Sequence, residues 1–130
     1  LQPISQHVVP IRFDGPLTFS TVAYFEDIVI EAVGDFPDAQ AILVVGSGIN
    51  EIDASGDERV REVAKQLRGR GVELYFSGLK HQVRSIFERT GLVEELGRDR
   101  FFPNKELALK VLLENYEPKT DAEQALARSA

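Results

Sequence analysis

The 130-residue chain is 43% hydrophobic and 28% charged, a composition that suits one globular domain and excludes a second full domain. Fifteen Lys and Arg against 21 Asp and Glu give a formal net charge of −6, which argues against binding nucleic acid or an anionic membrane surface through a general basic field. With no cysteine and only two histidines, disulfides and Cys/His metal cages are excluded, so we expect no metal and no cofactor. No stretch approaches the roughly 18 to 20 apolar residues of a membrane-spanning helix. Methionine is also absent, and we therefore expect the chain to be a processed product or a piece of a longer protein.

The chain begins with short extended segments. Apolar residues alternate with others over 8–13, which predicts a strand with one buried face. Because Pro10 cannot donate to a strand ladder, either this strand is expected at a sheet edge or its proline is expected at an outward-facing position. Gly15-Pro16 then turns the chain, and a second short strand at 17–19 completes a predicted antiparallel hairpin.

Helices and strands alternate over the rest of the chain. Apolar residues at three- and four-residue steps indicate helices, and short apolar runs bounded by glycine indicate strands. The predicted helices cover 20–33, 57–68, 79–90 and 104–116, with one further turn at 92–96, and the predicted strands cover 41–45, 72–76 and 100–102. The run Ala41–Val45 is apolar throughout, which is typical of a central strand covered on both faces.

This alternation predicts an α/β fold. We expect a mixed, mostly parallel sheet of about four to five strands with an antiparallel edge hairpin, and about four to five helices. The domain is expected to span 7–117, preceded by an N-terminal linker at 1–6. A C-terminal tail is expected at 118–130, where the sequence becomes polar and alanine-rich.

The loop at 46–56 is the predicted functional region. It follows the most buried strand, and the sites of open α/β sheets gather at the carboxyl ends of strands. Gly46-Ser47-Gly48 resembles a fragment of a phosphate-binding loop, but no complete glycine-rich nucleotide motif is present, so a simple turn is the favoured interpretation. The candidate interaction or nucleotide-binding residues are Gly46, Ser47, Gly48, Asn50, Asp53, Ser55 and Gly56.

Ser55 has two alternative roles. It stands three positions before Glu58, the spacing of a capping box, so its hydroxyl is predicted to cap the following helix. A serine at a helix N-terminus is also a place where the helix dipole favours an added phosphate. Glu51, Asp53, Asp57 and Glu58 lie close to it in the sequence, and their charge opposes the phosphate, which favours the cap.

No residues point to catalysis. Asp53 is interpreted as a loop-stabilising carboxylate that accepts from backbone amides, rather than as a phosphoacceptor or metal ligand. A triad of Ser55, His81 and Asp53 lacks the G-x-S-x-G element that would support it. We therefore expect no catalytic residues, with a small phosphate- or nucleotide-handling enzyme built on the same loop as an alternative.

Several short motifs follow one another in a recognisable order. They are Asp53-Ala54-Ser55-Gly56, Arg68-Gly69-Arg70-Gly71-Val72-Glu73-Leu74, Ser77-Gly78-Leu79, Val83-Arg84, Gly91-Leu92 and Phe101-Phe102-Pro103-Asn104-Lys105-Glu106-Leu107-Ala108. With the order of the elements, they resemble a STAS domain, the fold shared by anti-sigma-factor antagonists and the cytosolic C-terminal domains of sulfate permease (SulP) transporters. The likeness covers nearly all of 8–116. The opening R-x-x-G-x-L-x-F, from Arg12 to Phe19, is similar to the start of the transporter-type domains.

The resemblance implies a regulatory or protein-interaction domain of a secondary anion transporter, and not an enzyme. The implied location is the cytoplasmic side of the bacterial inner membrane, within an integral membrane protein. The implied partners are the transmembrane domain of the same transporter, an acyl carrier protein or a nucleotide, with a homodimer left open and no nucleic acid expected.

The alternative within the family is a stand-alone anti-sigma-factor antagonist switched by phosphorylation of Ser55. In those antagonists the serine is followed by glycine and an apolar residue. Here Asp57 follows Gly56, and this departure argues against the switch.

Overall fold

Strands and helices alternate along residues 5–117, the part of the chain that the computed structural model describes. The strands are β1 (Val8–Arg12), β2 (Gly15–Leu17), β3 (Ala41–Val45), β4 (Ile49–Ile52), β5 (Glu73–Ser77) and β6 (Phe101–Phe102). The helices are α1 (Val22–Asp35), α2 (Ala54–Arg68), α3 (His81–Arg89), α4 (Leu92–Leu96) and α5 (Lys105–Tyr116), and a 3-10 turn at Arg98–Arg100 precedes β6. Residues 1–4 of the expected linker and the expected tail at 118–130 lie outside the described residues.

Four strands form a parallel sheet in the order β1-β3-β5-β6. β3 lies inside the sheet and all five of its residues are buried, as its unbroken apolar run predicts. β1 lies at an edge, where Pro10 is tolerated although it has no N–H to donate. The predicted α/β fold is confirmed.

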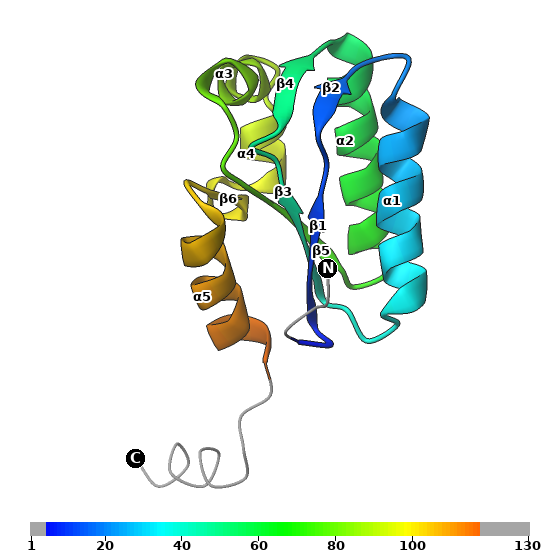
Figure 1. Ribbon diagram of the computed structural model, residues 1–130, viewed down its shortest axis with the longest axis vertical. Helices are drawn as coiled ribbons and strands as arrows, with labels where there is room; N and C mark the ends of the chain where they lie inside the picture. Colours follow the sequence, from blue (N-terminus) through cyan, green and yellow to red (C-terminus); the bar gives the residue numbers. More distant parts are fainter. Residues whose placement is uncertain (1–4, 118–130) are drawn as a thin grey trace, which may run out of the picture.

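The predicted antiparallel hairpin at the start of the chain is wrong. β2 pairs in parallel with β4 in a separate two-stranded sheet, and all strand pairs within residues 5–117 are parallel. The segment after β1 keeps its direction beside the segment after β3, because the Phe13 amide donates to the Val45 carbonyl at 3.5 Å and the Gly15 amide to the Gly48 carbonyl at 2.8 Å. Gly15, at a φ of 95°, therefore bends the chain without reversing it, and the two paired segments pass from one sheet into the other (Figure 1).

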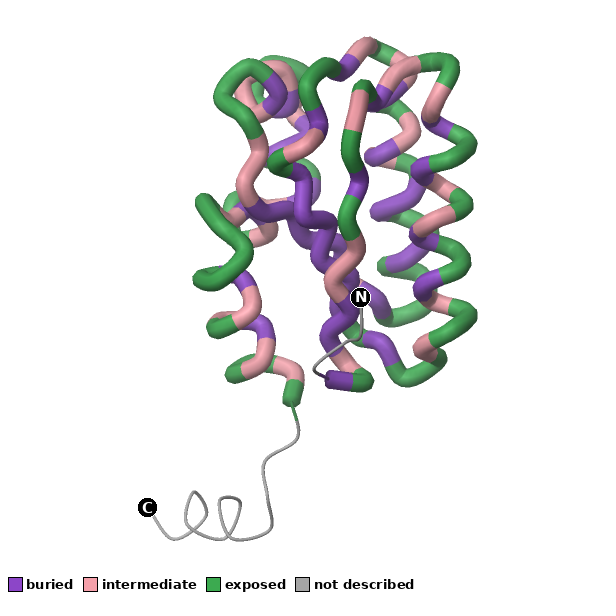
Figure 2. Tube along the Cα trace, in the orientation of Figure 1, coloured by how far each residue is buried: buried purple, intermediate pink, exposed green. Residues whose placement is uncertain are grey.

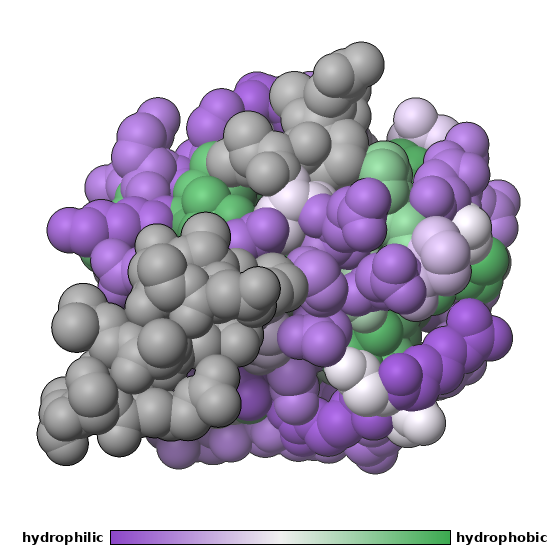
Figure 3. Space-filling model, turned by 90° about the horizontal axis from the view of Figure 1, so that it is seen from below, coloured by the Kyte–Doolittle hydropathy of each residue, from purple (hydrophilic) through white to green (hydrophobic). Residues whose placement is uncertain are grey.

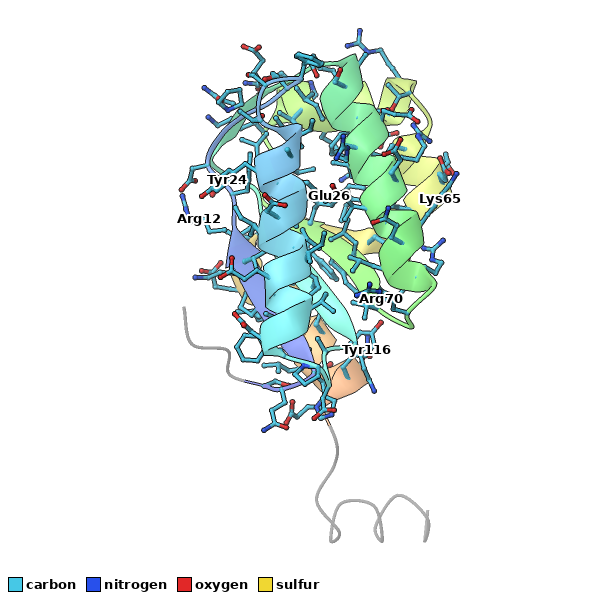
Figure 4. All side chains as sticks on the ribbon, turned by 90° about the vertical axis from the view of Figure 1, so that its right-hand side faces the viewer. Arg12, Tyr24, Glu26, Lys65, Arg70 and Tyr116 are labelled. Carbon is cyan, nitrogen blue, oxygen red and sulfur yellow. The ribbon has the colours of Figure 1, made fainter. Side chains whose placement is uncertain are left out.

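Helices cover both faces of the main sheet. α1 and α2 run side by side on one face, and α5 lies on the other (Figures 1 and 4). The α1–α2 side holds the larger hydrophobic core, whose largest fully buried side chains include Phe13, Phe25, Phe76 and Phe87. Figure 2 shows that burial is most continuous along the strands and falls on one side of each helix.

The α5 side has a smaller core of its own, made of Val8, Ala41, Leu43, Tyr75, Ala108 and Leu112. The helix begins where predicted, because Asn104 Oδ1 accepts a hydrogen bond from the Leu107 amide at 2.8 Å and caps its first turn. Near its end, the hydroxyls of Tyr75 and Tyr116 bond to each other at 2.6 Å. α5 is therefore capped at its start and bonded to β5 of the sheet near its end.

The surface carries many ion pairs, and the end of the molecule seen in Figure 3 is largely hydrophilic with separate hydrophobic areas. Arg59 joins α2 to α1 through a 2.8 Å contact between its Nη1 and Glu26 Oε1, and Figure 4 shows Glu26 on α1. None of the helices in residues 5–117 is both long enough and apolar enough to span a bilayer.

Candidate functional site

The predicted loop at 46–56 contains a strand and is divided by it. Gly46, Ser47 and Gly48 form a tight turn after β3, closed by a hydrogen bond from the Ile49 amide to the Gly46 carbonyl at 3.1 Å. β4 follows with Asn50 exposed on it, and Asp53, Ser55 and Gly56 come after it at the start of α2. Since four extended residues span on the order of 10 Å, the structure separates the predicted residues into two groups, one at each end of β4.

Asp53, not Ser55, caps α2. Its Oδ1 accepts a hydrogen bond from the Gly56 amide at 2.8 Å. Its Oδ2 accepts from the Phe19 amide at 3.0 Å, and its own amide donates to the Leu17 carbonyl at 3.3 Å. The Phe19 amide first, and then the Gly56 amide, lower the pKa of the Asp53 carboxyl below its ordinary value of 3.8. One carboxylate thus ties the helix start to the loop between β2 and α1, as predicted for a loop-stabilising residue.

The predicted cap at Ser55 is wrong because the helix begins earlier than expected. α2 starts at Ala54, so Ser55 already lies in its first turn, where it is half-buried. Asp53 has the extended backbone, at φ −115° and ψ −177°, that an N-cap residue adopts before the helix. The capping-box spacing of Ser55 and Glu58 is therefore coincidental.

The close packing around Gly56 explains why the D-A-S-G motif ends in glycine. A Cβ atom at this position would stand 2.1 Å from the Leu17 carbonyl oxygen and 3.0 Å from the Ile52 side chain. Glycine alone lets β2 lie this close to the first turn of α2. The motif therefore consists of a cap, a helix start and a point of close backbone approach.

The acidic residues around Ser55 are less repulsive than the sequence suggests. Asp57 is buried, and its Oδ2 contacts Arg61 Nη2 at 3.0 Å while its Oδ1 accepts from the Thr90 hydroxyl at 2.7 Å. The charge of Asp57 is thus offset inside the protein, whereas Glu58 stays exposed. The electrostatic argument against a phosphate at Ser55 is correspondingly weaker.

Phe19 is the residue that sequence reasoning missed. Its side chain is 79% exposed, although its amide is held by Asp53. An exposed aromatic beside polar groups is typical of a binding surface. The signal was present as the final position of R-x-x-G-x-L-x-F, but the sequence does not show that this position faces solvent. We call Phe19, Asp53 and Ser55 the cap surface.

The triad considered from the sequence is not assembled. His81 stands exposed at the start of α3, and its Nε2 lies 3.4 Å from the Ser85 hydroxyl. Both oxygens of Asp53 accept from backbone amides. Within residues 5–117, no three or more His, Asp or Glu side chains are grouped so as to hold a metal ion.

Comparison with known proteins gives one family match and several relatives. A family model described as "STAS domain" matches residues 2–108. Probable sulfate transporter 4.2 of Arabidopsis thaliana is 27% identical over 128 residues, covering 91% of this chain and 19% of that protein. The chain spans about a fifth of the length of the curated relatives it matches.

Solved structures agree with the fold. The STAS domain of a SulP transporter from Vibrio cholerae has a TM-score of 0.70 at 21% identity, covering 88% of this chain and 86% of that chain. The murine anion transporter Slc26a9 gives 0.76 at 22% identity, covering 85% of this chain and 18% of that chain. The anti-sigma factor antagonist SpoIIAA in its unphosphorylated form gives 0.67 at 18% identity, covering 85% and 92%. The matched proteins are transporters, a transporter domain and an anti-sigma factor antagonist, and none is described as an enzyme.

Proposed function

Because the chain belongs to the STAS domain family, we propose that it is a regulatory and protein-interaction domain of a sulfate-permease-like anion transporter. It acts through contacts with the transmembrane domain of that transporter or with a soluble partner, on the cytoplasmic side of a bacterial inner membrane, and it catalyses no reaction. The sulfate transporters among its relatives support this assignment.

The exposed aromatic ring of Phe19 is the observation that carries the proposal. Burying an aromatic side chain on a partner contributes strongly to binding, and such residues are enriched in interfaces. Asp53 fixes the backbone of Phe19 against α2 through the 3.0 Å hydrogen bond to its amide. A ring held on a rigid backbone loses little conformational freedom when it binds. The cap surface is therefore the proposed contact.

A charge placed on this ring tests the contact. In a transporter that carries this domain, Phe19→Glu is expected to lower sulfate uptake into proteoliposomes severalfold without lowering the melting temperature of the isolated domain. Ile30→Glu is the matched control, because Ile30 on α1 is also a large exposed apolar residue, at 53%. Equal uptake by the two variants would argue against the cap surface. The wider assignment is tested by the coding sequence before Leu1, where roughly ten or more apolar spans of about 20 residues are expected.

A stand-alone antagonist switched at Ser55 is the second candidate. It is favoured by the pairing of Asp57 with Arg61, which reduces the negative charge that a phosphate at Ser55 would meet. If the transporter assignment is right, incubation with serine kinases of the source cell leaves Ser55 largely unmodified, as measured by intact-mass spectrometry. Stoichiometric modification that is abolished in Ser55→Ala would favour the antagonist instead.

Other proposed partners are an acyl carrier protein, a nucleotide and a second copy of the domain. Binding of an acyl carrier protein or a nucleotide is tested by titration while the NMR signals of the amides at 46–56 are followed. Formation of a homodimer is tested by sedimentation. Micromolar nucleotide binding accompanied by turnover would contradict the non-enzymatic assignment and support the small-enzyme alternative.

A further inference from the structure

A second group of polar residues lies apart from the cap surface, where the main sheet meets the start of α5. The paired residues Arg12, Val45, Ser77 and Phe102 form one row across the carboxyl ends of β1, β3, β5 and β6. Since side chains alternate along a strand, Ser77 points to the same face as Tyr75, which packs under α5. The row therefore faces the α5 side of the sheet.

Three residues of this row, Arg12, Val45 and Ser77, line a cleft of about 410 Å³. Its walls come from the turn after β3 and from the N-terminus of α5, and its lining includes Ser47, Gly78, Asn104, Lys105 and Glu106. The chain between β6 and α5 is short and places the helix start beside β6 (Figure 1), and residues 103–106 line the cleft together with Arg12, Val45 and Ser77. The cleft thus lies at the carboxyl edge of a parallel sheet, where ligands of such folds bind.

Ser77 is the residue that points to a ligand. It is fully buried, and its Oγ has no hydrogen-bond partner among the described residues. A buried hydroxyl without a partner costs about 1 to 3 kcal/mol, so such groups are rare unless something else satisfies them. The backbone around it is otherwise satisfied, since the Ser77 carbonyl accepts from the Gly46 amide at 2.9 Å and the Gly78 amide donates to Phe102 at 3.0 Å.

The lining of the cleft carries two cations, Arg12 and Lys105, against one carboxylate. Arg12 is half exposed, and its Nε donates to both oxygens of Asp14, at 3.0 and 2.9 Å. Its terminal N–H groups have no acceptor within residues 5–117 and can bind another one. Lys105 lies in the first turn of α5, whose dipole also favours negative charge. Glu106 is the opposing charge in the lining, and Asp14, outside the lining, offsets part of the charge of Arg12. Two cations, a helix N-terminus and two serine hydroxyls are donors suited to a tetrahedral oxyanion.

We propose that this cleft binds a tetrahedral oxyanion, sulfate or a phosphate group, with Ser77 and Ser47 as hydroxyl donors and Arg12 and Lys105 as the countercharges. The site does not depend on the cap surface or on the transporter assignment. Its volume also accommodates an oxyanion attached to a larger group.

Titration followed by amide NMR tests the site. Sodium sulfate, sodium phosphate and adenosine monophosphate are added separately at constant ionic strength, with sodium chloride as the reference. Saturable shifts are expected at the amides of Ser47, Gly78, Lys105 and Glu106. A response to both inorganic ions identifies the free anion as ligand, and a response to the nucleotide alone identifies a phosphate ester. Thermal shift is unsuitable as the readout, because sulfate stabilises proteins generally.

Two variants and a control complete the test. Ser77→Ala and Arg12→Gln are each expected to weaken binding by about tenfold, the effect of losing one hydrogen bond to a charged group. Ser77→Ala removes a buried unsatisfied hydroxyl, so the variant is expected to fold, and Arg12→Gln changes only the surface. Lys65→Gln, on the exposed side of α2, is the control and leaves binding unchanged. Unsaturable shifts, shifts equal to those with chloride, or equal binding by Ser77→Ala and the unmodified chain would overturn the proposal and leave a buried water as the partner of Ser77.

Discussion

Gly56→Ala tests how β2 is packed against α2. The new Cβ would lie 2.1 Å from the Leu17 carbonyl oxygen, far inside the 3.4 Å at which ordinary contact begins. Because the obstacle is backbone, β2 or the helix start must move. Overpacking of this kind costs about 1 to 3 kcal/mol. It also weakens the hydrogen bond from the Asp53 amide to Leu17, a loss of about 1 kcal/mol.

The opposing effect is the helix preference of alanine, which favours the variant by about 0.5 to 1 kcal/mol. We therefore expect Gly56→Ala to lower the free energy of unfolding by about 1 to 3 kcal/mol, or roughly 3 to 10 °C in melting temperature. Gly34→Ala is the matched control, because Gly34 lies in α1 and its Cβ would meet nothing within 4 Å. This control is expected to gain about 0.5 to 1 kcal/mol.

Urea unfolding followed by far-UV circular dichroism measures both variants under the same conditions. A Gly56→Ala chain as stable as the unmodified protein, alongside a stabilised Gly34→Ala chain, would refute the close approach of Leu17 to α2. A loss of stability in both variants would point to a general effect of alanine at these glycines.

Other substitutions test the cap and the α5 contact. Ser55→Ala is expected to change stability by less than about 0.5 kcal/mol because the cap is Asp53; a larger loss in urea unfolding would restore Ser55 as the cap. Because the folded-state pKa of Asp53 is lowered, its contribution to stability is complete above its ordinary pKa of 3.8 and is lost as the pH falls through the folded-state value. Asp53→Asn should therefore be less stable at pH 7 and lose less on acidification, and parallel acid unfolding curves would contradict this. Burial first, and then the Tyr116 hydroxyl, raise the pKa of Tyr75 above its ordinary value of 10. The contribution of Tyr75 to stability is therefore complete below pH 10 and falls as the pH rises above it. Tyr116→Phe is expected to cost about 1 kcal/mol at pH 7 and to make this alkaline decline shallower.

Much of the main sheet could be predicted from the sequence because its strands are marked by local composition. The run Ala41–Val45 is apolar at every position and proved to be the fully buried β3. Asn104 was recognised as a helix start because an asparagine after proline is a strong local signal, and it caps α5. For β3 and the start of α5, the residues that determine the structure lie within one short segment, and the predictions were correct.

β4 was not predicted, because the residues that make this segment a strand lie elsewhere in the chain. In Ile49–Ile52, two polar residues separate two buried isoleucines, so the segment has neither an alternating nor a continuous apolar pattern. Its strand geometry comes from parallel pairing with β2. The same pairing overrode the turn signal at Gly15-Pro16 and made the predicted hairpin wrong.

Of the residues predicted at the start of α2, Asp53 has the loop-stabilising role expected of it, but the cap expected at Ser55 is Asp53 instead. Asp53 and Ser55 are both good caps by residue type, and the start of α2 at Ala54, which sequence pattern does not fix to the residue, decides between them. Sequence charge also overstated the acidity around Ser55, since Arg61 and Thr90 engage Asp57. The row that includes Arg12 and Ser77 depends on strand register, which local sequence does not encode.

The small separate core beneath α5 has a consequence for how the domain opens. A helix fixed by few buried side chains can detach at a lower free energy than global unfolding requires. In hydrogen–deuterium exchange, amides of α5 are then expected to exchange faster than those of β3. The difference between the opening free energies of the two elements is expected to shrink gradually as denaturant is added. One face of the sheet would thus stay covered by α1 and α2 while the other face is transiently exposed by the detachment of α5.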